Sequence, residues 1–180
     1  MHRVELLRHG ATVSGSGRYC GRSDVTLTAE GWTQMRRAVE GRHWDRIVSS
    51  PLRRCAAFAQ DIARHLHVDC ALDARWQELN FGSWEHRRAA DLDAAELGRF
   101  WRDPDRYPPP GGERLGSLCK RVRDAHEALR ASMKDNERVL VVTHGGPMRV
   151  LLSAPGASAA ELLGIDVPHA ALRACPDAPQ

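Results

Sequence analysis

The sequence has no long apolar segment. No run approaches the roughly 18 consecutive apolar residues that a transmembrane helix needs. The opening stretch, MHRVELLRHG, also lacks the apolar core of a secretion signal. We therefore expect a cytoplasmic protein without a membrane partner.

A strong charge of one sign is also missing. The 26 Lys+Arg and 23 Asp+Glu residues give a formal net charge of +3, and no five consecutive residues are basic. We therefore expect no nucleic-acid partner, because a nucleic-acid-binding surface normally carries a denser basic patch. A local anion-binding site is compatible with this balance.

Cysteine occurs at five widely spaced positions that include no C-x-x-C pair, so we expect reduced thiols. A chain of 180 residues buries about two thirds of the surface that its unfolded form exposes, which makes disulfides and structural metals unnecessary. No repeat or linker divides the chain. We expect one domain over residues 1–180.

Strand and helix patterns alternate along the chain. Three apolar runs are typical of buried strands: RVELL at 3–7, RIVSS at 46–50 and RVLVVT at 138–143. Helical spacing predicts helices over 28–39, where Thr28 is the expected N-cap, over 52–66 and over 118–133. This order predicts an α/β fold, with three layers (α/β/α) and a mostly parallel central sheet.

Residues 85–116 interrupt this alternation. A short helical piece precedes DPDRYPPPGGERLG, whose proline and glycine content is incompatible with regular structure. We expect an excursion here that could serve as a lid. The tail after residue 153 predicts at most one short helix and one edge strand.

Two histidines follow two of the predicted strands. His9 and His144 are each followed by glycine, and the carboxyl ends of parallel strands meet at one edge of a sheet. Arg8 lies beside His9, and SSPLRRCA directs Arg53 or Arg54 to the same edge. The alternative is that the two histidines are unrelated surface or capping residues.

Converging arginines and histidines repel one another unless an anion binds between them. A phosphate monoester carries about −1.5 to −2 charges and three acceptor oxygens, which suits two arginines. The same cations lower the pKa of a nearby imidazole from about 6.5, so that one histidine stays neutral and nucleophilic. A departing alkoxide needs a proton donor, for which WQELNFGSWE offers Glu78 and Glu85.

Other conspicuous residues have simpler interpretations. We expect Trp76 and Trp84 to wall the pocket around the acid, and KRVRD at 120–124 to be the exposed face of a helix. The HLH stretch at 65–67 is expected at a helix end, since no other metal ligands accompany it.

Six stretches resemble the histidine phosphatase superfamily, which includes the cofactor-dependent phosphoglycerate mutases. They occur in the family's order: LLRHGAT, GRYCGRSDVTLTAEG, SSPLRRCAAFAQDIA, ELNFGSWE, PPGGERLGSLCKRV and VLVVTHGGPMR. The resemblance implies a phosphoglycerate mutase-like fold. It also implies that His9 forms a phosphohistidine and that Glu78 is the proton donor, without a metal or cofactor. The phosphoryl oxygens would be held by Arg8, Arg54 and His144, with backbone amides near Gly21 and Gly145.

The sequence departs from the family at two positions. Ala11 replaces a glutamate that often follows R-H-G, and Gly15 stands where the family often has asparagine. One phosphate contact is therefore missing or supplied from elsewhere. The H-G-G block places the chain in the mutase-like branch.

Two stretches, FWRDPDRYPPPGGERL and DVPHAAL, are similar to the corresponding stretches of alpha-ribazole phosphatases, which act in cobalamin biosynthesis. The expected activity is therefore metal-independent hydrolysis of a small phosphomonoester, with alpha-ribazole 5′-phosphate as the favoured substrate. The alternatives are a broad-specificity phosphatase, a phosphoglycerate mutase-like enzyme and a non-catalytic phosphate-binding protein. The sequence carries no signal for an oligomeric state.

Overall fold

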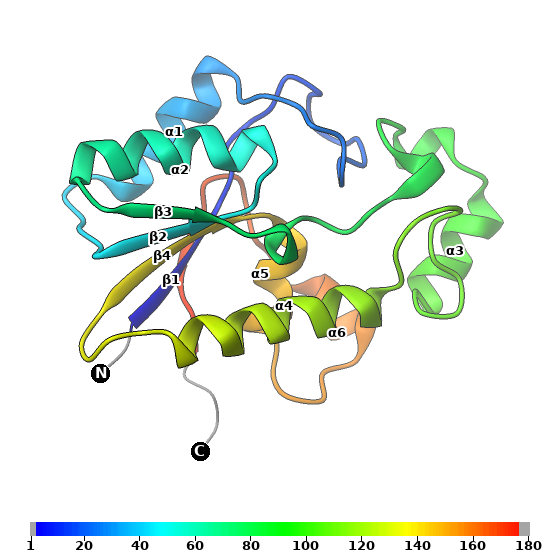
Figure 1. Ribbon diagram of the computed structural model, residues 1–180. Coiled ribbons are helices and arrows are strands. Elements are labelled where there is room, and N and C mark those ends of the chain that lie inside the picture. The colour runs from blue at the N-terminus through cyan, green and yellow to red at the C-terminus, as the bar shows by residue number, and fades with distance from the viewer. Residues whose placement is uncertain (1–2, 177–180) are drawn as a thin grey trace.

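A mostly parallel sheet forms the middle layer of the computed structural model, which describes residues 3–176 (Figure 1). Within these residues the sheet has five strands in the order β3-β2-β4-β1-β5. The strand β5 is antiparallel to β1 and forms one edge. The bounds are Arg3–Arg8 for β1, Arg46–Ser49 for β2, Asp69–Leu72 for β3, Arg138–Thr143 for β4 and Leu172–Ala174 for β5.

Helices cover both faces of the sheet, which confirms the three-layer α/β/α prediction. In Figure 1, α1 and α2 lie on one face and α4 and α5 on the other. The helices span Ala29–Val39 (α1), Arg53–Leu66 (α2), Ala94–Arg102 (α3), Leu115–Ala131 (α4), Gly145–Leu152 (α5) and Ala159–Gly164 (α6). Short 3-10 turns lie at Ala74–Trp76, Gly82–Trp84 and Ala89–Asp91. None of the helices within residues 3–176 is both long and apolar enough to cross a membrane.

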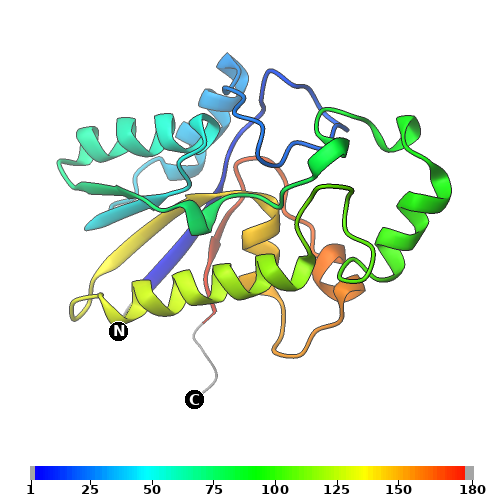
Figure 2. The same cartoon turned by 45° about the vertical axis from the view of Figure 1, so that its right-hand side comes forward.

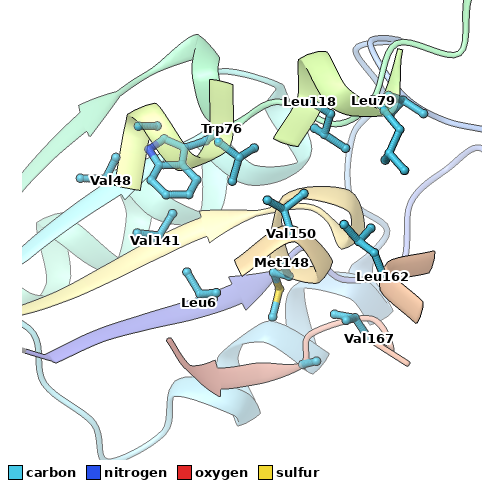
Figure 3. Close-up of a cluster of buried hydrophobic side chains, with 14 of the residues drawn as sticks. Leu6, Val48, Trp76, Leu79, Leu118, Val141, Met148, Val150, Leu162 and Val167 are labelled. Carbon is cyan, nitrogen blue, oxygen red and sulfur yellow. The ribbon is translucent and has the colours of Figure 1, made fainter. Parts of the chain in front are cut away.

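Alternate residues of the central strands fill two hydrophobic cores. Leu6 and Val141 face the α4 and α5 side, where Figure 3 shows them near Met148 and Val150. The next residues along these strands, Leu7 and Val142, belong to the core on the α1 and α2 side. Full burial of one such side chain contributes roughly 1.5–3 kcal/mol, so both helical layers are held by apolar contact.

The predicted starts of α1 and α2 lie within one residue of the structure, whereas α4 begins at Leu115, three residues before the predicted position. Thr28 is the N-cap of α1, and its side chain accepts a hydrogen bond from the Gly31 amide at 3.0 Å. The tail forms α6 and the edge strand β5, as predicted. The strand β3 was not predicted because its side chains are largely exposed, which gives an edge strand no apolar signature.

The proline-rich stretch is irregular, as predicted, yet it is attached to the segment that carries Glu78. Pro110 accepts a hydrogen bond from the Ser83 amide at 2.9 Å, and Asn80 accepts one from the Glu113 amide at 2.8 Å. Figure 2 shows α3 at the same end of the molecule as α6 and the start of α4. The movement of this excursion as a lid stays a prediction.

Candidate active site

The register of the sheet brings the two strand-end histidines together. β1 and β4 pair in parallel with Arg8 opposite Thr143, so the following residues are His9 and His144. The centroids of their rings lie 5.3 Å apart. Ser50, which follows β2, places its hydroxyl 2.8 Å from Nε2 of His144. The predicted convergence of strand ends is therefore confirmed.

Within residues 3–176, one ring nitrogen of His9 has no hydrogen-bond partner. Its Nδ1 lies 2.8 Å from the Gly10 carbonyl oxygen, and a carbonyl only accepts, so Nδ1 carries the proton. Burial, and then the charges of Arg54 and Arg8, hold the pKa of His9 well below its ordinary value. The ring is therefore neutral near pH 7, with its lone pair on Nε2.

Arg54 is fully buried and ties the site together. Its Nε donates to Nδ1 of His144 at 3.2 Å, and its Nη1 donates to the Ser23 carbonyl at 2.7 Å. Its Nη2 donates to the carbonyl oxygens of Gly21 at 2.5 Å and Cys20 at 3.4 Å. Of the two candidate arginines at the start of α2, Arg53 lies outside, where it pairs with Asp24.

His144 lies behind His9, and both of its ring nitrogens are engaged. Nδ1 accepts from Arg54, so Nε2 carries the proton and donates to Ser50. Burial, and then the charge of Arg54, hold the pKa of His144 well below its ordinary value. A phosphoryl oxygen can bind this imidazole only in exchange for Ser50.

Arg8 is half-buried and has unused donor capacity. Its Nη1 donates to the Val167 carbonyl, but its buried Nε finds no partner among the described residues. Burial lowers the pKa of Arg8 despite the neighbouring charge of Glu78. Within residues 3–176 neither Arg8 nor Arg54 pairs with a carboxylate. A buried guanidinium without a counter-ion favours an anionic ligand.

The carboxylate of Glu78 lies against the N-terminal end of α5. Its carboxylate accepts from the Gly146 amide at 3.0 and 3.1 Å and from the Leu79 amide at 2.9 Å. A Cβ at Gly146 would lie 2.1 Å from Oε1 of Glu78, so any side chain at this position would have to displace the carboxylate. The amides at the N-terminus of α5 bind the Glu78 carboxylate, and the absence of a side chain at Gly146 leaves the space that it occupies.

Arg121 corrects the expectation of an exposed KRVRD face. Its guanidinium bonds the Glu113 carboxylate at 2.7 and 2.9 Å and donates to the Glu78 carbonyl at 2.9 Å. Arg22 donates to the same carbonyl from the other side at 3.0 Å. These two side chains immobilise the backbone of Glu78, and no periodic pattern in the sequence marks them.

Glu85 and Gly21 have bracing positions. The Glu85 carboxylate accepts from the amides of Gly21 at 3.1 Å and Arg22 at 3.0 Å. Burial would raise the pKa of Glu85, but its hydrogen bonds with Ser23 and these amides hold it below the ordinary value. The Gly21 amide is thus occupied, and this residue contributes its carbonyl to Arg54. Gly145 lies against Arg8, whose Cζ is 3.6 Å from the place of a Cβ at that glycine.

An apolar cavity of about 180 Å³ opens beside Glu78. Trp76 and Trp84 do not line it, contrary to expectation, because both are buried in the core. The aromatic wall comes from α3 and two loops, with Trp101 49% exposed. The lining consists of Tyr19, Glu78, Leu79, Phe81, Phe100, Trp101, Leu115, Leu118, Gly146, Arg149, Leu162 and Leu163.

A third histidine near the site was missed from the sequence. The ring centroid of His169 lies 5.5 Å from that of His9. His169 belongs to the DVPHAAL stretch, which was the available signal.

Gly15 contributes no side chain and has a φ of +76°. In the described part of the chain, no three His, Cys, Asp or Glu side chains are grouped to hold a metal, and His67 ends α2 as expected.

Comparison with known proteins decides the family. The sequence model of the histidine phosphatase superfamily (branch 1) matches residues 4–175. The chain belongs to this superfamily. The match and the solved relatives show the phosphoglycerate mutase-like fold for this chain.

Individual relatives point to different substrates. The chain is 37% identical over 159 residues to a bifunctional protein of Mycobacterium tuberculosis, covering 83% of this chain but only 43% of that relative. A mycobacterial glucosyl-3-phosphoglycerate phosphatase solved with VO3 is 29% identical, with a TM-score of 0.83 over 97% of this chain and 92% of that one. The alpha-ribazole phosphatase of Shigella flexneri is 26% identical, with a TM-score of 0.82 over 96% and 89% of the two chains.

The lowered histidine pKa values predict a loss of stability in mild acid. The unfolded chain takes up protons on these histidines near pH 6.5, whereas folded His9 and His144 do so only at lower pH. Protonation therefore favours the unfolded state below about pH 6.5 and has no effect above it. Urea unfolding at about pH 7.5 and about pH 5.5 measures this change, which we expect to be smaller in His9→Gln. An equal change in both proteins would contradict the electrostatic account.

Proposed function

We propose that this protein hydrolyses phosphate monoesters through a phosphohistidine on His9. The observation that carries the proposal is a neutral His9 next to Arg8, where Nε2 of His9 and Nε of Arg8 have no hydrogen-bond partner among residues 3–176. Nε2 of His9 is the nucleophile, and the Nε–H of Arg8 is a hydrogen-bond donor to a phosphoryl oxygen. The nucleophile needs no deprotonation, because burial and two arginines already keep it neutral.

In the first step, Nε2 of His9 attacks phosphorus and the bond from phosphorus to the alcohol oxygen breaks. Glu78, which enters the cycle as a protonated carboxyl group, delivers its proton to the departing oxygen and becomes a carboxylate. In the second step, Glu78 takes a proton from water, whose oxygen attacks phosphorus and breaks the phosphorus–nitrogen bond. Phosphate leaves, and both His9 and Glu78 return to their starting states.

The cations stabilise charge on the phosphoryl oxygens. Arg8 offers its Nε, and the four bonds of Arg54 leave one of the five guanidinium N–H groups for the ligand. His144 turns its Nε2–H from Ser50 to an oxygen. These groups form the charge-stabilising environment that a phosphoryl transfer requires.

The apolar cavity beside Glu78 supports a leaving group whose alcohol carries an aromatic base. A flat aromatic base fits between the rings of Tyr19, Phe81 and Trp101 better than a polar sugar does. We propose alpha-ribazole 5′-phosphate, an aromatic nucleoside phosphate, as the substrate. The likeness to an alpha-ribazole phosphatase supports this choice.

Arg149 favours a second candidate. Its guanidinium lines the same cavity, with Nε donating to the Ile165 carbonyl at 2.8 Å. An arginine at this place suits the carboxylate of a phosphoglycerate-type substrate. The similarity to a glucosyl-3-phosphoglycerate phosphatase agrees with this alternative.

A substrate panel tests the proposed function. Phosphate release is measured with a metal chelator present, from alpha-ribazole 5′-phosphate, glucosyl-3-phosphoglycerate, 3-phosphoglycerate and 4-nitrophenyl phosphate. We expect kcat/KM for the ribazole ester to exceed the others about 100-fold, or about 2.7 kcal/mol of transition-state discrimination. Similar rates for all four would indicate a broad phosphatase. Binding of phosphate without any release would favour the non-catalytic alternative.

Displacing Glu78 without removing it gives a second test. In Gly146→Ala, the new Cβ collides with Oε1 of Glu78, so we expect kcat to fall about 100-fold or more while the fold persists. Steady-state kinetics with an alkyl phosphate and a circular dichroism spectrum measure the two effects. Gly164→Ala is the matched control, since no atom lies within 4 Å of its Cβ position. Equal kinetics in the two variants would argue against Glu78 as the acid.

A further inference from the structure

The segment before β5 is fastened to the pair that begins the site. The Arg8 amide donates to the Ala171 carbonyl at 3.0 Å, and the Ala170 amide donates to the His9 carbonyl at 3.1 Å. The guanidinium of Arg8 also bonds the Val167 carbonyl. Because these contacts come from both sides of His169, they fix its backbone beside His9.

Backbone strain marks the same place. Ala170 has a φ of +56°, in the left-handed region that residues with a Cβ rarely adopt. Such a conformation is unfavourable and persists where surrounding contacts determine it, often at functional sites. Here the bond from Ala170 to the His9 carbonyl holds the conformation, and the residue before it is His169.

The side chain of His169 has no structural task that explains this placement. Its ring centroid is 5.5 Å from that of His9, while the residue as a whole is exposed. Among residues 3–176, no group forms a hydrogen bond with its imidazole. The charged groups around it are Arg8 from β1 and Glu30 from α1. Partial burial, and then the charge of Arg8, lower its pKa.

His9 is thus flanked by two imidazoles of different character. His144 lies behind it, fully buried and with both nitrogens engaged. His169 lies on the open side, with donor capacity left for a ligand. Arg54 and His144 are fully buried, whereas His169 is exposed, so His169 marks the side of His9 that lies nearest to solvent.

We propose that His169 is a phosphoryl-binding residue at the mouth of the site, where its imidazole donates a hydrogen bond to the phosphoryl group at His9. The assignment rests on the proposed function, since it places the phosphoryl group at His9. The imidazole of His169 binds the phosphoryl group from the solvent side, whereas Arg8 and Arg54 bind it from the protein interior.

Equilibrium binding of inorganic phosphate tests the assignment without relying on turnover. Titration calorimetry at about pH 7.5 compares the unmodified chain with His169→Ala and with His65→Ala, a control at the exposed end of α2. We expect His169→Ala to bind phosphate about tenfold more weakly, as the loss of one hydrogen bond to a charged group predicts. We expect the control to retain its affinity and both variants to keep their thermal midpoints.

Two results would overturn the proposal. One is a phosphate affinity of His169→Ala within a factor of about two of the unmodified chain. The other is a weaker affinity that appears only together with a lower thermal midpoint, since that would show a structural role. A chain that binds phosphate through His169 but hydrolyses no ester would contradict the proposed function and leave this assignment standing.

Discussion

The buried guanidinium of Arg54 is the group on which the candidate site depends. Its hydrogen bonds join the loop at 20–23, the start of α2 and the imidazole of His144. No carboxylate in the described residues pairs with it, so its charge adds to burial, the larger cause, in lowering the pKa of His9 and His144. One side chain therefore positions His144 and helps to keep the proposed nucleophile neutral. Its charge acts strongly because both imidazoles are buried.

The sequence predicted the parts of this arrangement that have local signatures. His9 and His144 follow apolar strands, and strand ends in a parallel sheet meet at one edge. Thr28 marked the start of α1 because N-cap chemistry is local. The sequence pattern at the start of α2 left open whether Arg53 or Arg54 enters the site. The family resemblance implied Arg54, which is the buried one of the two. The family resemblance added the choice of Glu78 over Glu85.

The remaining contacts depend on residues far apart in the chain. Arg121 was expected on an exposed helix face, but it meets carbonyl oxygens about 45 positions away, which no helical period reveals. Glu85 braces a loop more than 60 positions earlier, and His169 reaches His9 through the antiparallel edge strand. Trp76 and Trp84 were wrongly predicted to line the pocket, because the stretch 76–84 supplies both core residues and pocket residues. Tertiary hydrogen bonding, rather than propensity, places Arg121 and Glu85.

A phosphoryl group on His9 is the central claim of this account. The measurement is a rapid alkaline quench of the enzyme during turnover of an aryl phosphate, followed by mass spectrometry of its peptides. The account predicts a phosphoryl group on the peptide that contains His9, formed at a rate no slower than turnover, and its absence in His9→Asn. Turnover without this species, or with the phosphoryl group on another residue, would contradict the account.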